Sequence, residues 1–331
     1  MRRAVGLVLV GLGTFLVVLA PLFHFYVAPH AAVAPLTCSS GPLCDRGVLL
    51  SPSSGVATTL FDAGSLKTLT NVPVSSQRRV KGDVSASTGA NDRTVYDESL
   101  TTVRSQDQSL VDSTTARIAF DGHSSQMIDC CHSNTDGTPI KDFSGIMPWK
   151  FPFDTQKKTY QYFDTVLAKA LPMKYVSTQT VDGVQTYKFV QVIPPTQFAT
   201  LEVPGSLVGS TQPSVTAPRF YANVRTVWVE PVTGVIVDGR EQIKQTLRDA
   251  SGADKLVLID VDLRFTAGNV KESAHLASQG KNKLTLVSTT VPLICLVLGI
   301  ISLVIGLVLL LRRSGEAGPA EPSPPVPAAT A

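Results

Sequence analysis

Apolar positions along the 331-residue chain concentrate in two uncharged segments, one near each end. Ala4–Phe23 has 20 residues without a charge. A helix of that length rises about 30 Å, which matches the hydrocarbon core of a bilayer. Leu284–Leu311 is uncharged over 28 residues, and within it Val291–Leu311 is the expected core crossing. The pattern therefore predicts two transmembrane helices and contact with the lipid bilayer.

The first apolar segment has an alternative interpretation as a cleaved secretory signal. Ala32-Val33-Ala34 has the small-x-small form of a cleavage site. The apolar region of a signal has only about 7–15 residues, and Pro35 directly follows this site. The length of the segment favours an uncleaved anchor.

Basic residues flank the two segments and predict their orientation. Arg2-Arg3 precede the first segment, and Arg312-Arg313 follow the second. Because basic residues accumulate on the cytoplasmic side of spans, we expect a two-pass plasma-membrane protein with both termini in the cytoplasm. The expected parts are residues 1–27 (N-terminus and first helix), 28–283 (extracytoplasmic domain), 284–311 (second helix) and 312–331 (cytoplasmic tail). The tail is rich in proline, so we expect it to be disordered.

Apolar and polar residues alternate through most of residues 28–283. Val257–Phe265 is apolar at every second position, which is typical of a half-buried antiparallel strand. Lys174–Ile193 predicts a hairpin around Asp182-Gly183, and Val224–Val237 predicts a second hairpin. Further strands are expected at Ser75–Val84, Arg93–Val103 and Thr114–Phe120.

Helical spacing is rare in the same region. Gln161–Leu171 has apolar residues at helical intervals and ends before Pro172. Val270–Lys283 is rich in helix formers and leads into the second apolar segment. The expected fold class is mainly β (α+β): an antiparallel, β-rich extracytoplasmic domain held between N- and C-terminal transmembrane helices. We expect a meander or a closed, barrel-like sheet with one or two helices against it.

Small residues recur at helical intervals in both apolar segments. They are Gly6, Gly13 and Ala20 in the first segment, and Cys295, Gly299, Ser302 and Gly306 in the second. Small residues let helix backbones approach closely in lipid. We interpret these faces as the packing surface between the two helices of one chain. The alternative is self-association into a homo-oligomer.

Four of the five cysteines lie in the expected extracytoplasmic domain, where an oxidising environment favours disulfides. They are Cys38, Cys44, Cys130 and Cys131. Three pairings are open, and we favour Cys38 with Cys44, which leaves the adjacent Cys130 and Cys131 as a pair. Neighbouring His132 raises the alternative of a metal cluster, but this spacing fits no standard zinc pattern.

Charge and motifs exclude several classes of function. The chain has a net charge of +3, and residues 28–283 keep only +1, because four of the 29 basic and two of the 26 acidic residues lie in the terminal segments. This balance gives no reason to expect a nucleic-acid partner. Motifs for nucleophilic, metal-dependent or phosphate-binding catalysis are missing from the sequence. We therefore expect no enzyme activity, no catalytic residues, no metal and no cofactor.

Aromatic residues are dense in one segment, which holds seven of the 22 aromatics within 21 residues. They are Phe143, Trp149, Phe151, Phe153, Tyr160, Tyr162 and Phe163. Such a cluster builds a local core, lines a pocket for a lipid or amphiphilic ligand, or forms a membrane-facing edge. Nearby Lys150, Lys157 and Lys158 suit anionic head groups.

Two blocks of the sequence resemble a known family. Trp149–Tyr160, followed by Phe163-Asp164, and Arg225–Gly239 are similar to signature segments of the actinobacterial porin-PorA-like family. The arrangement of two spans around a β-rich middle resembles that family as well. The resemblance implies a membrane protein of the cell envelope, and the family label implies a channel. It carries no functional residues over to this chain.

These observations lead to two hypotheses. The first is a non-enzymatic envelope protein whose extracytoplasmic β domain binds a lipid or amphiphilic ligand, or an envelope partner, with the aromatic segment 143–163 as the candidate site. The alternative is an oligomeric, porin-like channel.

Overall fold

A computed structural model describes residues 2–38, 41–87 and 93–311. The chain divides into two units, one within Met1–Pro29 and Thr285–Ala331, and the other comprising His30–Leu284. The expected tail, residues 312–331 with Arg312 and Arg313, lies outside the described residues.

The first unit is built from two long apolar helices. One runs through α1 (Arg2–Leu22), the π-helical turn η1 (Phe23–Val27) and α2 (Ala28–Ala31). The other runs through η4 (Leu286–Thr290) and α4 (Val291–Leu311), whose bounds match the predicted core crossing. Both are long and apolar enough to cross a membrane.

Glycines bring α1 and α4 into close contact. A Cβ atom added to Gly13 would lie 2.7 Å from the carbonyl oxygen of Gly299, and one added to Gly306 would lie 2.9 Å from that of Gly6. Ala20 and Ser302 are buried as well, whereas Cys295 is half-buried. The small-residue faces predicted from the sequence therefore meet within one chain, where larger side chains would force the two backbones apart.

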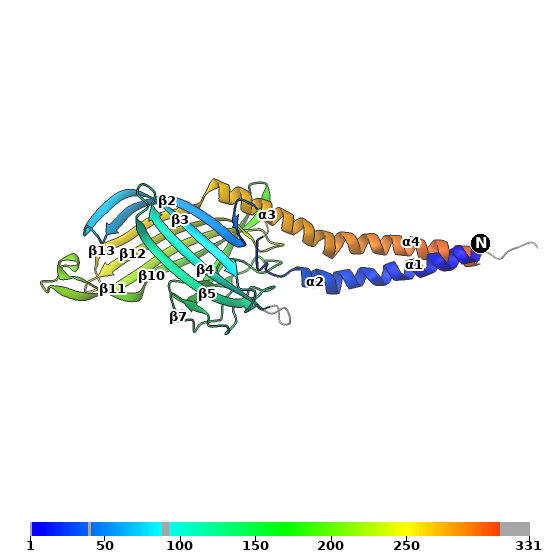
Figure 1. Ribbon diagram of the computed structural model, residues 1–331, viewed down its shortest axis with the longest axis horizontal. Coiled ribbons are helices and arrows are strands. Elements are labelled where there is room, and N and C mark those ends of the chain that lie inside the picture. Colours follow the sequence, from blue (N-terminus) through cyan, green and yellow to red (C-terminus); the bar gives the residue numbers. More distant parts are fainter. Residues whose placement is uncertain (1, 39–40, 88–92, 312–331) are drawn as a thin grey trace, which may run out of the picture. The chain divides into compact units, whose positions relative to one another are not determined.

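The second unit is dominated by one antiparallel sheet of 13 strands (Figure 1). The strands are β1 (Cys44–Asp45), β2 (Val48–Asp62), β3 (Lys67–Gly82), β4 (Arg93–Arg104), β5 (Leu110–Asp121), β6 (Asn134–Thr135), β7 (Thr138–Pro139), β8 (Tyr160–Asp164), β9 (Lys169–Val181), β10 (Val184–Pro204), β11 (Ser214–Val229), β12 (Ile236–Arg248) and β13 (Asp254–Phe265). Their order is β7-β6-β5-β4-β3-β2-β13-β12-β11-β10-β9-β8, with β1 beside β2. A short 3₁₀ turn, η3 (Gly205–Val208), follows β10. The mainly β fold, both predicted hairpins and the further predicted strands are confirmed.

The sheet curls, and two irregular segments join its far edges. Bridges link Phe120 of β5 to Met127, Gln126 to Ile146, and Ile146 to Tyr162 of β8. Backbone hydrogen bonds follow the same route: the N–H of Met127 donates to the Gly145 oxygen at 3.0 Å, and that of Ile146 to the Gln161 oxygen at 2.7 Å. We call the segments 125–128 and 145–147 the seam. The seam closes the hydrogen-bonded ring at this level of the sheet.

One helix, α3 (Ala267–Thr285), packs on the sheet and covers the predicted Val270–Lys283. Ala274 and Ala277 lie against Val184 and Val237 in a small apolar cluster. The Asn269 amide donates to the Ser51 hydroxyl and to the Pro52 oxygen, each at 3.0 Å. Small and polar residues thus anchor the start of the helix closely to the strands.

The predicted helix over Gln161–Leu171 is wrong. The segment forms the end of β8, a turn, and the start of β9, in which Pro172 pairs with Gln161. The Asp164 carboxylate accepts hydrogen bonds from the N–H groups of Val166 and Leu167, and this fixes the turn. The helical spacing of apolar residues here arises from two strands joined by a short turn.

Both disulfides of the pairing favoured from the sequence are present. Cys38 pairs with Cys44, with 5.7 Å between the Cα atoms, and Cys130 pairs with its neighbour Cys131. The first bond fixes the start of the β unit to β1. The second lies two residues beyond the seam.

Candidate functional site

The aromatic segment 143–163 is divided between two buried clusters. Phe163, Phe143 and Trp149 join a cluster with Tyr96 and Phe120. Phe151, Tyr160 and Tyr162 join a second cluster with Phe189, Val227 and Val229. Phe151 and Phe163 are fully buried, and Tyr162 is 2% exposed. Six of the seven candidate ligand-binding aromatics are therefore packed against other side chains of the β unit.

Phe153, the seventh, packs between two basic side chains. Its ring stacks on His123 with 5.8 Å between centroids, and the Lys150 ammonium lies 3.7 Å from its centroid. Lys150 is buried and donates to the Phe151 oxygen at 2.8 Å. Burial lowers the pKa of Lys150 to about 7. This group changes its charge near neutral pH.

A layer of charged and polar side chains lies on the inner face of the curled sheet. Arg225 on β11 is at its centre, because the strand register places Gln191 and Glu241 directly beside it. The Arg225 guanidinium donates to Gln191 Oε1 at 2.7 Å and to Glu241 Oε1 at 3.1 Å, and it is 3.1 Å from Asp164 Oδ2. Asp164 is completely buried. One cation thus binds three partners from β10, β12 and the end of β8.

Asn223 and Tyr221 extend this layer along β11. The Tyr221 hydroxyl donates to Asp164 Oδ2 at 3.2 Å. The Asn223 amide nitrogen donates to the Tyr221 hydroxyl at 2.9 Å and to Glu241 Oε2 at 3.1 Å. Asn223 is 1% exposed, yet its Oδ1 has no hydrogen-bond partner. A buried acceptor without a donor is unfavourable, so this oxygen lowers the stability of the layer.

A second ion pair, Arg78 on β3 with Glu98 on β4, completes the layer. Arg78 Nε lies 3.1 Å from Glu98 Oε1. Burial raises the pKa of Glu98, and Arg78 opposes this effect. Burial also acts to raise the pKa of Glu241, but the cations Arg225 and Arg78 outweigh it and hold that pKa below its ordinary value. Arg78 acts on Glu241 across two intervening strands, as expected for side chains that face a common interior.

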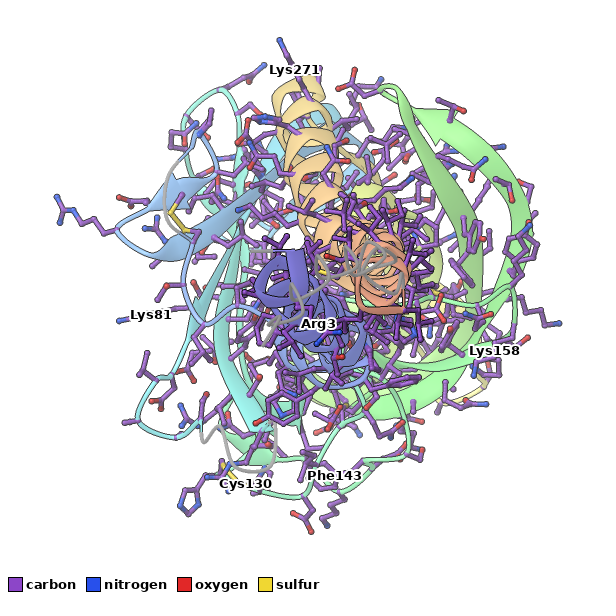
Figure 2. All side chains as sticks on the ribbon, turned by 90° about the vertical axis from the view of Figure 1, so that its right-hand side faces the viewer. Arg3, Lys81, Cys130, Phe143, Lys158 and Lys271 are labelled. Atoms are coloured by element: carbon purple, nitrogen blue, oxygen red, sulfur yellow. A yellow bond between two sulfur atoms is a disulfide. The ribbon has the colours of Figure 1, made fainter. Side chains whose placement is uncertain are left out.

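Solvent reaches part of this layer. The side chains of Arg78 and Glu241 are 23% and 24% exposed, although both point to the inner face. Figure 2 shows the early strands (blue to cyan) and the later strands (green) on opposite sides of the β unit. Each of the two side chains is therefore partly accessible to solvent.

Apolar residues of the inner face adjoin the charged layer. Because successive inward residues are two positions apart on a strand, the neighbours of the charged residues define what lies on each side of this layer. On one side are Val80, Tyr96, Phe189 and Val227. On the other side, Ile243 follows Glu241 and joins a cluster with Val74 and Val261, whereas the polar residues Ser76 and Asn223 follow Arg78 and Arg225. The inner face therefore carries a polar band with an apolar surface on one side and mixed apolar and polar residues on the other.

Sequence reasoning missed this charged layer. Its members come from strands far apart in the sequence, and each looks like an ordinary polar residue of an alternating strand. Arg225 and Asp164 do lie within the two family-like blocks, which is the signal that could have found them. Over the described ranges, no group of three His, Cys, Asp or Glu side chains is placed to hold a metal ion.

A β-rich unit joined to two long apolar helices defines a membrane protein of the cell envelope. The chain belongs to the Porin PorA family, whose model matches residues 5–308. It is similar to a Porin PorA of Corynebacterium resistens, with 26% identity over 95% of this chain and 98% of that protein. It is also similar to a Porin PorA of Corynebacterium amycolatum, with 28% identity over 60% of this chain and 63% of that protein.

Proposed function

We propose that this chain is a non-enzymatic, two-pass membrane protein whose extracytoplasmic β unit binds an amphiphilic ligand, such as a lipid, on its inner face. Both termini lie in the cytoplasm in this proposal, and the bilayer surrounds α1 and α4. The length and apolar character of the two helices and the basic residues beyond them support this topology.

The observation that carries the ligand assignment is the partly accessible charged layer with apolar residues of the inner face beside it. Arg78 and Glu241 are partly exposed and can bind a polar group. An acyl chain or other apolar part would lie along Val74, Ile243 and Val261. The aromatic segment 143–163 then has a supporting role, because it closes the apolar end of this interior.

Native mass spectrometry of the full chain, released gently from its membrane, tests the proposal. We expect a bound molecule of lipid mass in the unmodified protein and at least tenfold less of it in Arg78→Gln. The matched control is Arg79→Gln, because Arg79 is the next residue, faces the other way and forms only an exposed pair with Asp45. Equal occupancy in both variants, or an unmodified protein without ligand, contradicts the proposal.

An oligomeric channel is the second candidate, and two observations favour it. The relatives carry the name porin, and inward charged residues are typical of water-facing barrel interiors. A channel predicts stepwise conductance in planar bilayers and a homo-oligomer in mild detergent. A monomer that conducts nothing rejects this candidate and leaves the ligand proposal standing.

A further inference from the structure

The position of the Cys130–Cys131 disulfide in the fold is not explained by stabilisation of the folded chain through loop closure. A disulfide stabilises a protein mainly by closing a loop in the unfolded chain, and the effect grows with loop length. A bond between adjacent residues closes the shortest loop there is. It therefore holds no distant segments together, and its main effect falls on the local backbone.

The backbone at this bond adopts an unfavourable conformation. Cys131 and His132 have φ angles of 63° and 60°, the left-handed region that residues with a Cβ rarely occupy. Two such residues in succession persist only when their surroundings hold them there. Opening the ring between Cys130 and Cys131 removes one of the constraints that hold this conformation.

The same backbone is attached to strand β5. The Arg117 guanidinium donates from Nε to the Cys131 oxygen at 2.9 Å. The Ser133 hydroxyl donates to the Cys130 oxygen at 2.8 Å and accepts from the Ala119 N–H at 3.1 Å. The disulfide loop thus holds the outer edge of β5 through two carbonyl groups.

The first segment of the seam, 125–128, ends two residues before the disulfide and contacts the same strand. The N–H of Ile128 donates to the Ala119 oxygen at 2.9 Å, so Ala119 binds both the seam and the disulfide loop. The seam has a weak point of its own at Ser125, which is fully buried at φ 58° with an unpartnered hydroxyl. Segments with strained and unsatisfied groups open at lower free energy than the core.

The disulfide is open to attack from solvent. Both cysteines are half-buried, and their neighbours Asp129 and His132 are exposed. Figure 2 shows Cys130 at the edge of the β unit. Access of a thiolate to a sulfur atom is the first requirement for thiol–disulfide exchange, and the exposed neighbours on both sides of the pair favour it.

We propose that Cys130–Cys131 is a reversible redox site for a dithiol reductant and that its reduction loosens the seam. One thiolate of the reductant attacks a sulfur, the Cys130–Cys131 bond breaks, and a mixed disulfide forms. The second thiol of the reductant then attacks the reductant's own sulfur in the mixed disulfide and displaces the cysteine that is still bound there. The two cysteines end as thiols, and the reductant, having supplied two electrons and two protons, ends as a disulfide. The proposal is independent of whether the inner face binds a ligand.

A dithiothreitol titration of the full chain in detergent tests the redox step, with Cys38–Cys44 as the internal control. Alkylation followed by peptide mass spectrometry should show Cys130 and Cys131 modified at a reductant concentration at least tenfold below that needed for Cys38 and Cys44. Reoxidation should restore the bond. Reduction of both disulfides together, or of Cys38–Cys44 first, overturns the proposal.

Hydrogen exchange tests the link to the seam. Amides of residues 125–128 and 145–147 should exchange at least tenfold faster in the selectively reduced protein, whereas those of β12 and β13 should not change. The Cys130→Ser, Cys131→Ser double variant should reproduce this pattern without reductant, and Cys38→Ser, Cys44→Ser should not. Unchanged exchange at the seam in the double variant rejects the link.

Discussion

Replacing Arg225 by methionine should destabilise the β unit strongly, because this guanidinium is the shared cation of the charged layer. Its side chain is 9% exposed, and it is paired with the fully buried Asp164 and with Glu241. Methionine keeps much of the volume but leaves two carboxylates without their cation. Removing one partner of a buried ion pair costs about 3–5 kcal/mol.

The expected change is large enough to see in a thermal melt. For a unit of this size, one kcal/mol shifts the midpoint by about 2–4 °C, so Arg225→Met should melt roughly 6–20 °C lower. Circular dichroism of the full chain in detergent, followed in the β-sheet signal, measures this shift. Asp164→Asn and Glu241→Gln, added to Arg225→Met, should recover part of the loss because they remove the uncompensated charges.

Arg240→Met is the matched control. Arg240, on the neighbouring strand β12, also binds a carboxylate, that of Asp262, but the two side chains are 32% and 39% exposed. Exposed pairs contribute about 0–1 kcal/mol, so its midpoint should fall by less than about 4 °C. Equal losses in the two methionine variants would refute the assignment of Arg225 as the organising cation.

Further predictions concern pH, the helix pair and the turn after β8. The pKa of Lys150 is about 7 in the folded state and about 10.4 in the unfolded chain. Because the unfolded chain binds more protons between these two values, the stability of the unmodified protein should rise from pH 7 to pH 10. Thermal melts at pH 7 and 9 should show a smaller rise in Lys150→Met. Gly13→Ile should lower the melting midpoint of the helices in detergent, because its Cβ would lie 2.7 Å from the Gly299 oxygen. Gly11→Ile, with open space around its Cβ, should leave the midpoint unchanged. Equal midpoints in the two variants would argue against the observed helix contact. Asp164→Ala removes the carboxylate that accepts hydrogen bonds from the N–H groups of Val166 and Leu167, so hydrogen exchange at these two amides should be at least tenfold faster. Exchange as slow as in the unmodified chain would show that the carboxylate does not hold the turn.

The sequence was informative where structure depends on local pattern. Alternation located the strands, and Asp182-Gly183 located a hairpin turn with φ angles of 44° and 78°. Strand lengths were less predictable: the strand expected at Val224–Val229 extends back to Ser214, through residues with weaker alternation. The Gln161–Leu171 segment was misread because strand–turn–strand and helix can give the same apolar spacing over eleven residues.

The candidate site was predictable only in part, because it depends on the curl of the sheet. The aromatic segment was recognised as a cluster, but its division between two buried clusters follows from the closure at the seam. The charged layer joins Arg78 to Glu98 and Arg225 to Asp164, and the second pair is 61 positions apart. No local pattern in the sequence indicates such pairs.

The most direct test of the account is the side of the membrane on which the β unit lies. In a Cys295→Ser background, we would introduce Lys67→Cys at the exposed start of β3 or Ser314→Cys beyond the second helix. Intact spheroplasts would then be treated with a membrane-impermeant maleimide. The account predicts labelling at position 67 in intact spheroplasts and at position 314 only after lysis. Labelling at 314 but not at 67 before lysis would contradict it.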